Sequence, residues 1–357
     1  MNRKKKYTVL IALVISLSLL LTGCGSTGSQ KAKEQSEQPQ KSDKQYTLRI
    51  GHNETTTSVT NKGLERFKKQ VEEGTNGKVT VELYPASQLG NARVIIESVQ
   101  AGTLEGAAVP NSNYTGFYAP ATIADLPYFF PTKEIAYKVM DGEVGQQFLK
   151  GYEKTNIKPI ALWETGFKMF TCNSPIKTPA DFKGKKFRVM ENPILIAQYK
   201  ALGADAIPIN FAELYNSLQQ GVVDGQETPP AGIFNMKLYE VQKYLLKSEH
   251  GWLPVIIGVN TKWFDSLPKE YQDVVAKSAT DNRDWVRQEL RRLEKEVYMP
   301  TFEKAGVKIV DLTPEEKQVF ANQVKDDTEA ALLKMLDSDG KAIYEKLKAK
   351  VAEEASK

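Results

Sequence analysis

The sequence predicts an α/β fold that is built as two lobes. The segment Tyr46–Pro110 alternates strand, helix, strand, helix and strand patterns, which is typical of an α/β layer with parallel strands. A second set of such units occupies Thr178–Glu227. A chain of 357 residues is also long enough for two domains of ordinary size. We therefore expect two α/β lobes, with the chain crossing between them more than once.

Hydrophobic periodicity gives the elements of the first half of the chain. Tyr46–His52 alternates apolar and polar residues, which indicates a strand. Ser58–Thr75 carries apolar residues at helical spacing and is followed by turn chemistry at Asn76-Gly77. The other elements expected here are a strand at Val79–Tyr84, a helix at Ala92–Ala101, a strand within Thr103–Pro110, a helix at Tyr137–Lys154, and strands at Ile157–Glu164 and Phe167–Asn173.

The second half is interpreted in the same way. Thr178-Pro179 is typical of a helix start, and the short strand that follows carries Arg188. The other expected elements are helices at Pro193–Leu202, Ala212–Gln220, Pro268–Tyr298 and Pro314–Lys348, and strands at Ala206–Ile209, Val223–Glu227 and Leu253–Asn260. The long helix at Pro268–Tyr298 could be a strut across the lobes or a dimer face, and we favour the strut.

The N-terminal residues have the features of an export signal. Met1–Lys6 is basic and Tyr7–Leu21 is almost wholly apolar, but the apolar run is shorter than the roughly 20 residues of a membrane span. We expect residues 1–23 to be a signal peptide. Residues 24–44 are rich in Gly, Ser, Gln and Lys, cannot form a core, and are predicted to be a flexible linker.

The end of the apolar run resembles a lipoprotein processing site. Leu21-Thr22-Gly23-Cys24 is similar to the lipobox of bacterial lipoproteins. The resemblance implies lipidation of Cys24, with acyl chains such as palmitate, and anchoring at the extracytoplasmic face of the cell membrane. The alternative is an ordinary signal peptide with an incidental cysteine. The other cysteine, Cys172, is expected to be a buried lone thiol.

Composition and charge exclude several classes of function. The formal net charge of +4 comes wholly from the leader, because Met1–Gly23 holds four basic residues and no acidic one. The rest of the chain is neutral overall, which argues against nucleic-acid binding by bulk electrostatics. The only histidines are His52 and His250, no GxSxG or HExxH motif occurs, and zinc ligands at standard spacing are missing, so neither an enzyme nor a metal or other cofactor is expected.

Several segments in register resemble one family of solute-binding proteins. They include "VEEGTNGKVTVELYPASQLG", "VQAGTLEGAAV", "LPYFF", the strand with Arg188, "ELYNSLQQGVVDGQE" and "WFDSLPKEYQDVV". Together they are similar to the dicarboxylate-binding (DctP-like) proteins of tripartite ATP-independent periplasmic (TRAP) transporters. The resemblance implies a two-lobed, periplasmic-binding-protein-like clamshell with a long helix spanning the lobes. Lobe I would comprise residues 45–165 and about 254–293, and lobe II residues 166–253 and about 294–350.

The resemblance also implies a set of ligand-binding residues. Arg188 matches the arginine that clamps a ligand carboxylate, and an arginine presents two parallel N–H donors to that group. Phe211 matches an aromatic residue that closes over the ligand. Thr228 falls where relatives often carry a ligand-binding asparagine, and Lys168 falls where some acidic-sugar binders carry a second arginine. The remaining cleft candidates are Asn53, Glu54, Asn111, Asn113, Trp163 and Glu191.

The predicted function is capture of a small organic anion and its delivery to a large and a small TRAP membrane subunit. C4-dicarboxylates rank first, because a second carboxylate could meet Lys168. Sugar acids such as uronates rank next, because Asn53, Glu54 and Asn111 would suit hydroxyl groups, and monocarboxylates rank third. A ligand-binding module for a sensor kinase is the alternative from another class. Asp224 and Glu227 are interpreted as parts of a turn and of the cleft rather than as a catalytic pair.

Overall fold

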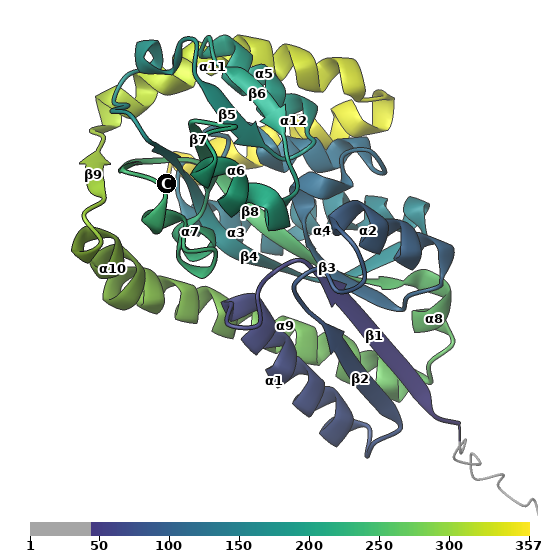
Figure 1. The fold of residues 1–357 in the computed structure, drawn as a ribbon. Coiled ribbons are helices and arrows are strands. Elements are labelled where there is room, and N and C mark those ends of the chain that lie inside the picture. Colours follow the sequence, from purple (N-terminus) through teal and green to yellow (C-terminus); the bar gives the residue numbers. More distant parts are fainter. Residues whose placement is uncertain (1–43) are drawn as a thin grey trace, which may run out of the picture. The chain divides into compact units, whose positions relative to one another are not determined.

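The computed structural model describes residues 44–357, which form one mixed β-sheet covered by helices (Figure 1). The expected signal peptide, the lipidation site Cys24 and nearly all of the expected linker lie outside the described residues. The strands are β1 (Tyr46–His52), β2 (Val79–Tyr84), β3 (Gly106–Pro110), β4 (Ile157–Cys172), β5 (Lys186–Val189), β6 (Asp205–Pro208), β7 (Gly225–Thr228), β8 (Tyr244–Asn260) and β9 (Lys308–Asp311).

The strand order separates two groups of parallel strands. The order is β2-β1-β3-β8-β4-β7-β5-β6, with β9 paired to β8. Within the first strand group (β1, β2 and β3), β1 pairs in parallel with both neighbours. Within the second strand group (β5, β6 and β7), β5 does the same. The long antiparallel strands β4 and β8 join the two groups, which gives the expected two-lobed α/β architecture.

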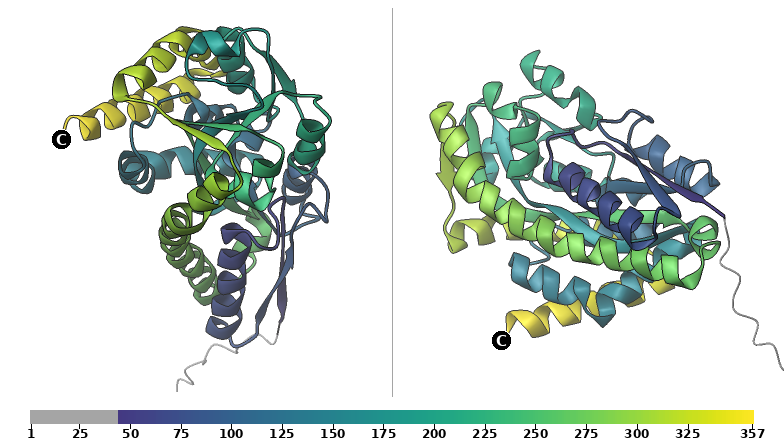
Figure 2. Two further views of the ribbon diagram at one scale, coloured as in Figure 1. Left: turned by 60° about the vertical axis from the view of Figure 1, so that its left-hand side comes forward. Right: turned by 90° about the horizontal axis from the view of Figure 1, so that it is seen from below.

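The helices pack on both faces of this sheet. They are α1 (Val59–Gly74), α2 (Ala92–Ala101), α3 (Lys133–Asp141), α4 (Glu143–Lys150), α5 (Pro193–Ala201), α6 (Leu214–Gln219), α7 (Pro230–Asn235), α8 (Thr261–Asp265), α9 (Lys269–Leu293), α10 (Met299–Lys304), α11 (Pro314–Met335) and α12 (Ser338–Ala355). The long helix α9 runs beside α1 and also packs on β4 (Figure 2). None of the helices within residues 44–357 is both long and apolar enough to cross a membrane.

The packing of α1 shows how the sequence pattern becomes structure. Ser58 caps the helix, because its side chain accepts a hydrogen bond from the backbone N–H of Asn61. The apolar stripe of Leu64, Phe67 and Val71 is fully buried, as the spacing predicts. Gly63 lets α1 approach α9 closely, since a Cβ atom there would lie 2.8 Å from Cγ2 of Val286.

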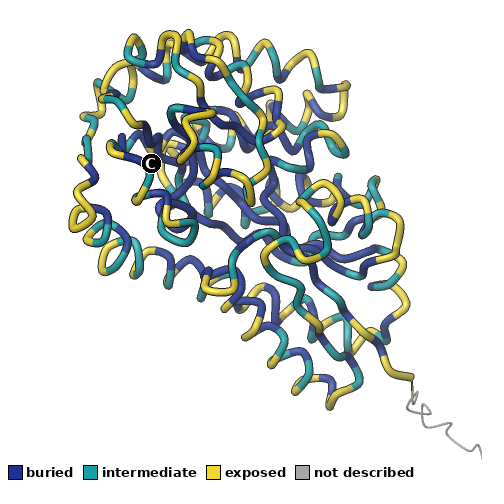
Figure 3. The backbone as a smooth tube through the Cα atoms, viewed as in Figure 1, coloured by how far each residue is buried: buried dark blue, intermediate teal, exposed yellow. Residues whose placement is uncertain are grey.

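The buried residues concentrate along the central strands of the sheet, such as β3, β7 and β8 (Figure 3). One cluster joins the first strand group to α1 and α9, and includes Leu48, Ile50 and Phe67. A second cluster packs α2, α3, α4 and α12 around β3. A third, centred on the rings of Phe170 and Phe187, supports the second strand group. The first cluster also includes Leu214, Leu218 and Val223, next to the second strand group, so both strand groups rest on packed apolar residues.

The structure corrects several predicted boundaries. The two predicted strands at Ile157–Glu164 and Phe167–Asn173 are one strand, β4, with register shifts that bend it. The predicted helix at Tyr137–Lys154 is two helices, α3 and α4, which meet at Gly142. The helix predicted from Thr178 is a single 3₁₀ turn at Pro179–Phe182, because the chain enters β5 soon afterwards.

The C-terminal half also differs from the prediction. β8 begins at Tyr244, nine residues before the predicted strand, and β9 was not predicted. The helix predicted at Pro268–Tyr298 is α9 followed by a π-helical turn at Glu294–Tyr298. The helix predicted to continue from Pro314 ends at Met335 and is followed by α12, whose N-cap is Asp337. The predicted division of the chain into lobes by residue number stays a prediction.

Candidate ligand-binding site

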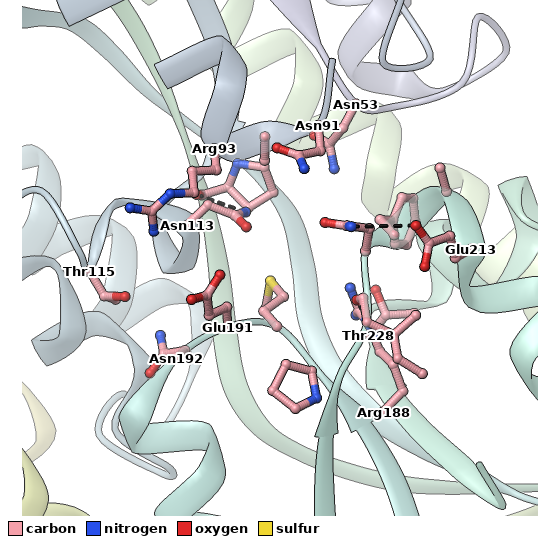
Figure 4. A pocket seen from close by; sticks show the side chains of 18 of the residues that line it. Asn53, Asn91, Arg93, Asn113, Thr115, Arg188, Glu191, Asn192, Glu213 and Thr228 are labelled. Atoms are coloured by element: carbon pink, nitrogen blue, oxygen red, sulfur yellow. Dashed lines mark hydrogen bonds between the residues drawn. The ribbon is translucent and has the colours of Figure 1, made fainter. Parts of the chain in front are cut away.

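A cavity of about 690 Å³ lies between the two strand groups. Its lining comes mainly from residues at or just after the carboxyl ends of the strands, which is where open α/β sheets bind ligands. In Figure 4, Asn53, Asn91, Arg93 and Asn113 enter from one side. Arg188, Glu191, Asn192 and Thr228 enter from the other. The cavity is thus lined from both lobes.

Most of the sequence-predicted residues meet in this cavity. Those that line it are Asn53, Glu54, Asn113, Arg188, Glu191, Phe211 and Thr228. Asn53 and Glu54 follow β1, Asn113 lies in the 3₁₀ turn after β3, and Glu191 lies two residues after the end of β5. Parallel strands bring these distant segments together because their carboxyl ends meet at the same edge of each group.

Arg188 is the main buried cation of the cavity. It lies on β5 between Ile207 of β6 and Gln226 of β7, and its residue is 4% exposed. Its Nε donates a hydrogen bond of 2.8 Å to the backbone oxygen of Ile209, and its guanidinium lies 5.9 Å from the ring centre of Phe211. The two terminal amino groups make no hydrogen bond with the described residues. Burial lowers the pKa of Arg188 to about 10, so the group stays charged at neutral pH.

Glu54 and Asn53 form a part of the cavity wall that is rich in acceptors. Glu54 is 6% exposed, and its carboxylate has no hydrogen-bond or ion-pair partner among the described residues. Burial raises the pKa of Glu54 to about 7. The Oδ1 atom of Asn53 is also buried without a partner. Unpaired buried acceptors are unfavourable unless a ligand or water supplies a donor.

Lys168 lies in a buried ion pair and does not line the cavity. Its Nζ is 3.0 Å from Oε1 of Glu227 and 3.9 Å from Oδ1 of Asp125. Glu227 lines the cavity and also accepts hydrogen bonds from Gln198 at 2.7 Å and from His250 at 2.8 Å. Burial alone would raise the pKa of Glu227, but Lys168 and His250 outweigh it and hold that pKa well below its usual range. Lys168 therefore has its charge neutralised within the protein.

The structure also places Asn111 and Trp163 away from the cavity lining. Asn111 is fully buried, donates a hydrogen bond of 2.8 Å to the backbone oxygen of Ala121, and accepts one from the hydroxyl of Tyr152. Trp163 is fully buried on β4, and its Nε1 donates to the backbone oxygen of Ala279 on α9 at 2.8 Å. Both side chains make structural contacts within the protein.

Some lining residues were not singled out by the sequence. Asn91 and Arg93, at the start of α2, line the cavity, as do Asn192 and Glu213. Arg93 is engaged near the surface, because its Nε lies 3.0 Å from Oε1 of Glu97 and its guanidinium stacks 5.3 Å from the ring centre of Phe117. The sequence did offer a signal for Asn91 and Arg93, because polar residues at the start of a helix that follows a turn often face a ligand site.

The chemistry of the site suits the binding of an anion. A buried guanidinium with free donors faces the cavity. Within residues 44–357, no group of three His, Cys, Asp or Glu side chains is arranged to hold a metal ion. The fold and the site together define a two-lobed solute-binding protein.

The chain belongs to the family described as bacterial extracellular solute-binding protein, family 7 (DctP), whose sequence model matches residues 50–334. This is a family of transporter solute-binding proteins and not of enzymes. The chain is 34% identical to the C4-dicarboxylate-binding periplasmic protein DctP of Rhodobacter capsulatus, over 76% of this chain and 82% of that protein. It is 32% identical to the 2,3-diketo-L-gulonate-binding periplasmic protein YiaO of Escherichia coli, over 78% of this chain and 86% of that protein.

A solved structure supports the same family and fold. The TRAP periplasmic solute-binding protein of Desulfovibrio salexigens with bound orotic acid superposes with a TM-score of 0.83 and is 38% identical. The match covers 86% of this chain and 100% of that one. The predicted family and the predicted two-lobed α/β fold are thereby confirmed. The relatives bind different organic acids, so membership of the family does not determine the ligand.

Proposed function

We propose that this chain captures a small organic carboxylate outside the cytoplasm and delivers it to the membrane subunits of a TRAP-type transporter. The observation that carries the proposal is the free donor face of Arg188 in the cavity. A guanidinium with two unused terminal amino groups matches the two oxygens of one carboxylate. Burial excludes competing water and strengthens that charge pair. Family membership supports the same function.

The C4-dicarboxylate ranking depended on Lys168 as a second cation. Because the charge of Lys168 is paired with Glu227, that argument does not support a second ligand carboxylate. We therefore propose the broader class, an organic anion bound through one carboxylate. The pairing of Lys168 supports neither the sugar acids as ligands nor the alternative that the protein serves a sensor kinase.

The role of Arg188 is tested by calorimetry on R188A and R188K. Removing the guanidinium strands a buried carboxylate, and we expect affinity to fall by about 2–5 kcal/mol, or tens- to thousands-fold. R188K keeps the charge but loses the two parallel donors, so its affinity should lie between those of R188A and the natural chain. Unchanged affinity in R188A would refute the proposal.

We further propose that lipid on Cys24 keeps the protein at the membrane. The proposal rests on the lipobox-like "LTGC" sequence and the polar residues after it. Two acyl chains hold a protein stably, where one gives only reversible binding. In cells, C24A should move the protein from the membrane fraction to the soluble fraction, and incorporation of labelled palmitate should be lost. A C24A chain that still sediments with membranes would contradict lipid anchoring.

A further inference from the structure

A buried hydrogen bond joins the two strand groups beside the cavity. Nδ2 of Asn192 donates to Oδ2 of Asp125 at 2.8 Å and to the backbone oxygen of Ser112 at 3.4 Å. Asn192 follows β5 of the second strand group, whereas Ser112 and Asp125 lie in the segment that follows β3 of the first. Each of the three residues is at most 1% exposed. The bond therefore ties segments of different strand groups together where water has almost no access.

Asn192 uses each end of its amide group for a different part of the molecule. Its Oδ1 accepts the backbone N–H of Ile194 at 2.9 Å and that of Leu195 at 3.4 Å, which caps α5. Backbone N–H groups only donate and an ionised carboxylate only accepts, so these partners fix which end of the amide is the oxygen. Asn192 thereby connects the start of α5 to the first strand group.

Asp125 is held by groups from several segments. The hydroxyl of Ser112 donates to its Oδ1, and Nζ of Lys168 on β4 lies 3.9 Å from the same oxygen. Burial raises the pKa of Asp125 to about 6, although Lys168, Ser112 and Asn192 act in the opposite direction, and the charge of Glu227 adds a smaller increase. The carboxyl is therefore largely ionised at pH 8. A hydrogen bond to an ionised acceptor is stronger than one between neutral groups.

The strands that join the two groups contain irregularities. The pairing of β4 with β8 shifts register between Glu164 and Gly166, and again between Lys168 and Phe170. Such irregularities let a strand bend. Because residues from both groups line the same cavity, any bend changes the width of the cavity. A link between the groups that belongs to neither β4 nor β8 would fix this width.

We propose that Asn192 and Asp125 are positioning residues, whose hydrogen bond holds the two strand groups at the spacing that gives the cavity its ligand-binding shape. Asn192 lines the cavity, but both polar atoms of its side chain are engaged within the protein. It therefore acts through the spacing and not through a contact with the ligand. A cavity that is fixed before the ligand arrives lowers the cost of ordering it on binding. This inference goes beyond the proposed function and does not depend on which solute binds.

Distances between spin labels in the ligand-free chain test the proposal. Nitroxides are attached to K69C on α1 and K200C on α5, and the distance between them is measured by double electron–electron resonance. Lys69 and Lys200 are exposed and lie outside the cavity lining. A C24A background leaves Cys172 as the only other cysteine, and its burial protects it from the label.

Replacing Asn192 with serine removes the bond and keeps the helix cap. Serine caps a helix about as well as asparagine, but its side chain is too short to reach Asp125. In N192S, the ratio of the natural distance to longer distances should fall by about tenfold or more. Asn91 supplies the matched control. It caps α2 by accepting the backbone N–H of Val94 at 3.1 Å and lines the cavity, but within residues 44–357 it makes no hydrogen bond to the second strand group. N91S should therefore leave the distances unchanged.

Exchanging the two side chains tests the bond itself, with circular dichroism to show that each variant is folded. N192D places two carboxyl groups face to face and should lengthen the distance at pH 9, where their repulsion is strongest. In N192D/D125N, an amide again faces a carboxylate, so the hydrogen bond can form in the opposite direction and the natural distance should return. If N192S keeps the natural distances, or if N192D/D125N is as widely spaced as N192S, the two residues do not set the spacing and the proposal is wrong.

Discussion

Replacing Lys168 with methionine should destabilise the fold more than it alters ligand affinity. The side chain is 1% exposed, and its Nζ lies 3.0 Å from Glu227. Removing one partner of a buried ion pair leaves an uncompensated charge, which costs about 3–5 kcal/mol. Glu227 would keep donors from Gln198 and His250, so we expect the lower end, about 3 kcal/mol. For a chain of this size, the melting temperature should fall by roughly 4–5 °C.

Urea unfolding followed by tryptophan fluorescence measures this difference. The matched control is K269M, because Lys269 forms an exposed pair with Asp273 at 2.5 Å. Exposed pairs of this kind contribute about 0.3–0.5 kcal/mol, so K269M should change the unfolding free energy little. If K168M is as stable as K269M but loses ligand affinity, the structural role of Lys168 is refuted and its sequence-predicted role in ligand binding is favoured.

Three further predictions concern the packing and titration of the first lobe. Burial lowers the pKa of His52 to about 4, so its contribution to stability is present above about pH 6.5 and is lost as the pH falls towards 4. Between pH 7 and pH 4, the natural chain should lose about 3 kcal/mol more unfolding free energy than H52Q, and equal losses would contradict this. G63A should cost about 1–3 kcal/mol in urea unfolding, because its Cβ would lie 2.8 Å from Val286, and a neutral effect would show that α1 and α9 can separate. W163F removes the donor to the backbone oxygen of Ala279 and should cost about 1–3 kcal/mol without changing ligand affinity, whereas a loss of affinity would point to a role in the cavity wall.

The sequence predicted which strands exist more reliably than where they end. Tyr46–His52 and Val79–Tyr84 match β1 and β2, because a half-buried strand alternates apolar and polar residues. The first part of β8 was missed because Lys247, Glu249 and His250 make it look like a polar loop. His250 can be buried although it is polar, because it hydrogen-bonds to the buried Glu227. The pattern of apolar and polar residues along the sequence cannot indicate such a partner.

The same limit of sequence patterns explains why Lys168 was predicted to face the ligand when it lies in a buried ion pair. The pairing of β4 with β8 shifts register between Glu164 and Gly166, just before Lys168, and a shift changes which face of the sheet the following side chains occupy. Sequence alone gives no signal for such a shift. Arg188 was easier to predict, because its short strand is regular and the motif around it is long.

The arrangement of the strands explains why the predicted ligand-binding residues lie in one cavity, although they come from separate segments of the sequence. Asn53 follows β1, Asn113 follows β3, Arg188 is the second-last residue of β5 and Thr228 ends β7. In each strand group, parallel pairing places these ends at one edge, and the antiparallel pair β4 and β8 sets the two edges opposite each other. The fold therefore brings together a donor from one lobe and acceptors from the other. Neither Arg188 nor Glu54 finds a full set of partners among residues 44–357, so the groups that this part of the fold leaves unpaired are those that a bound solute can satisfy.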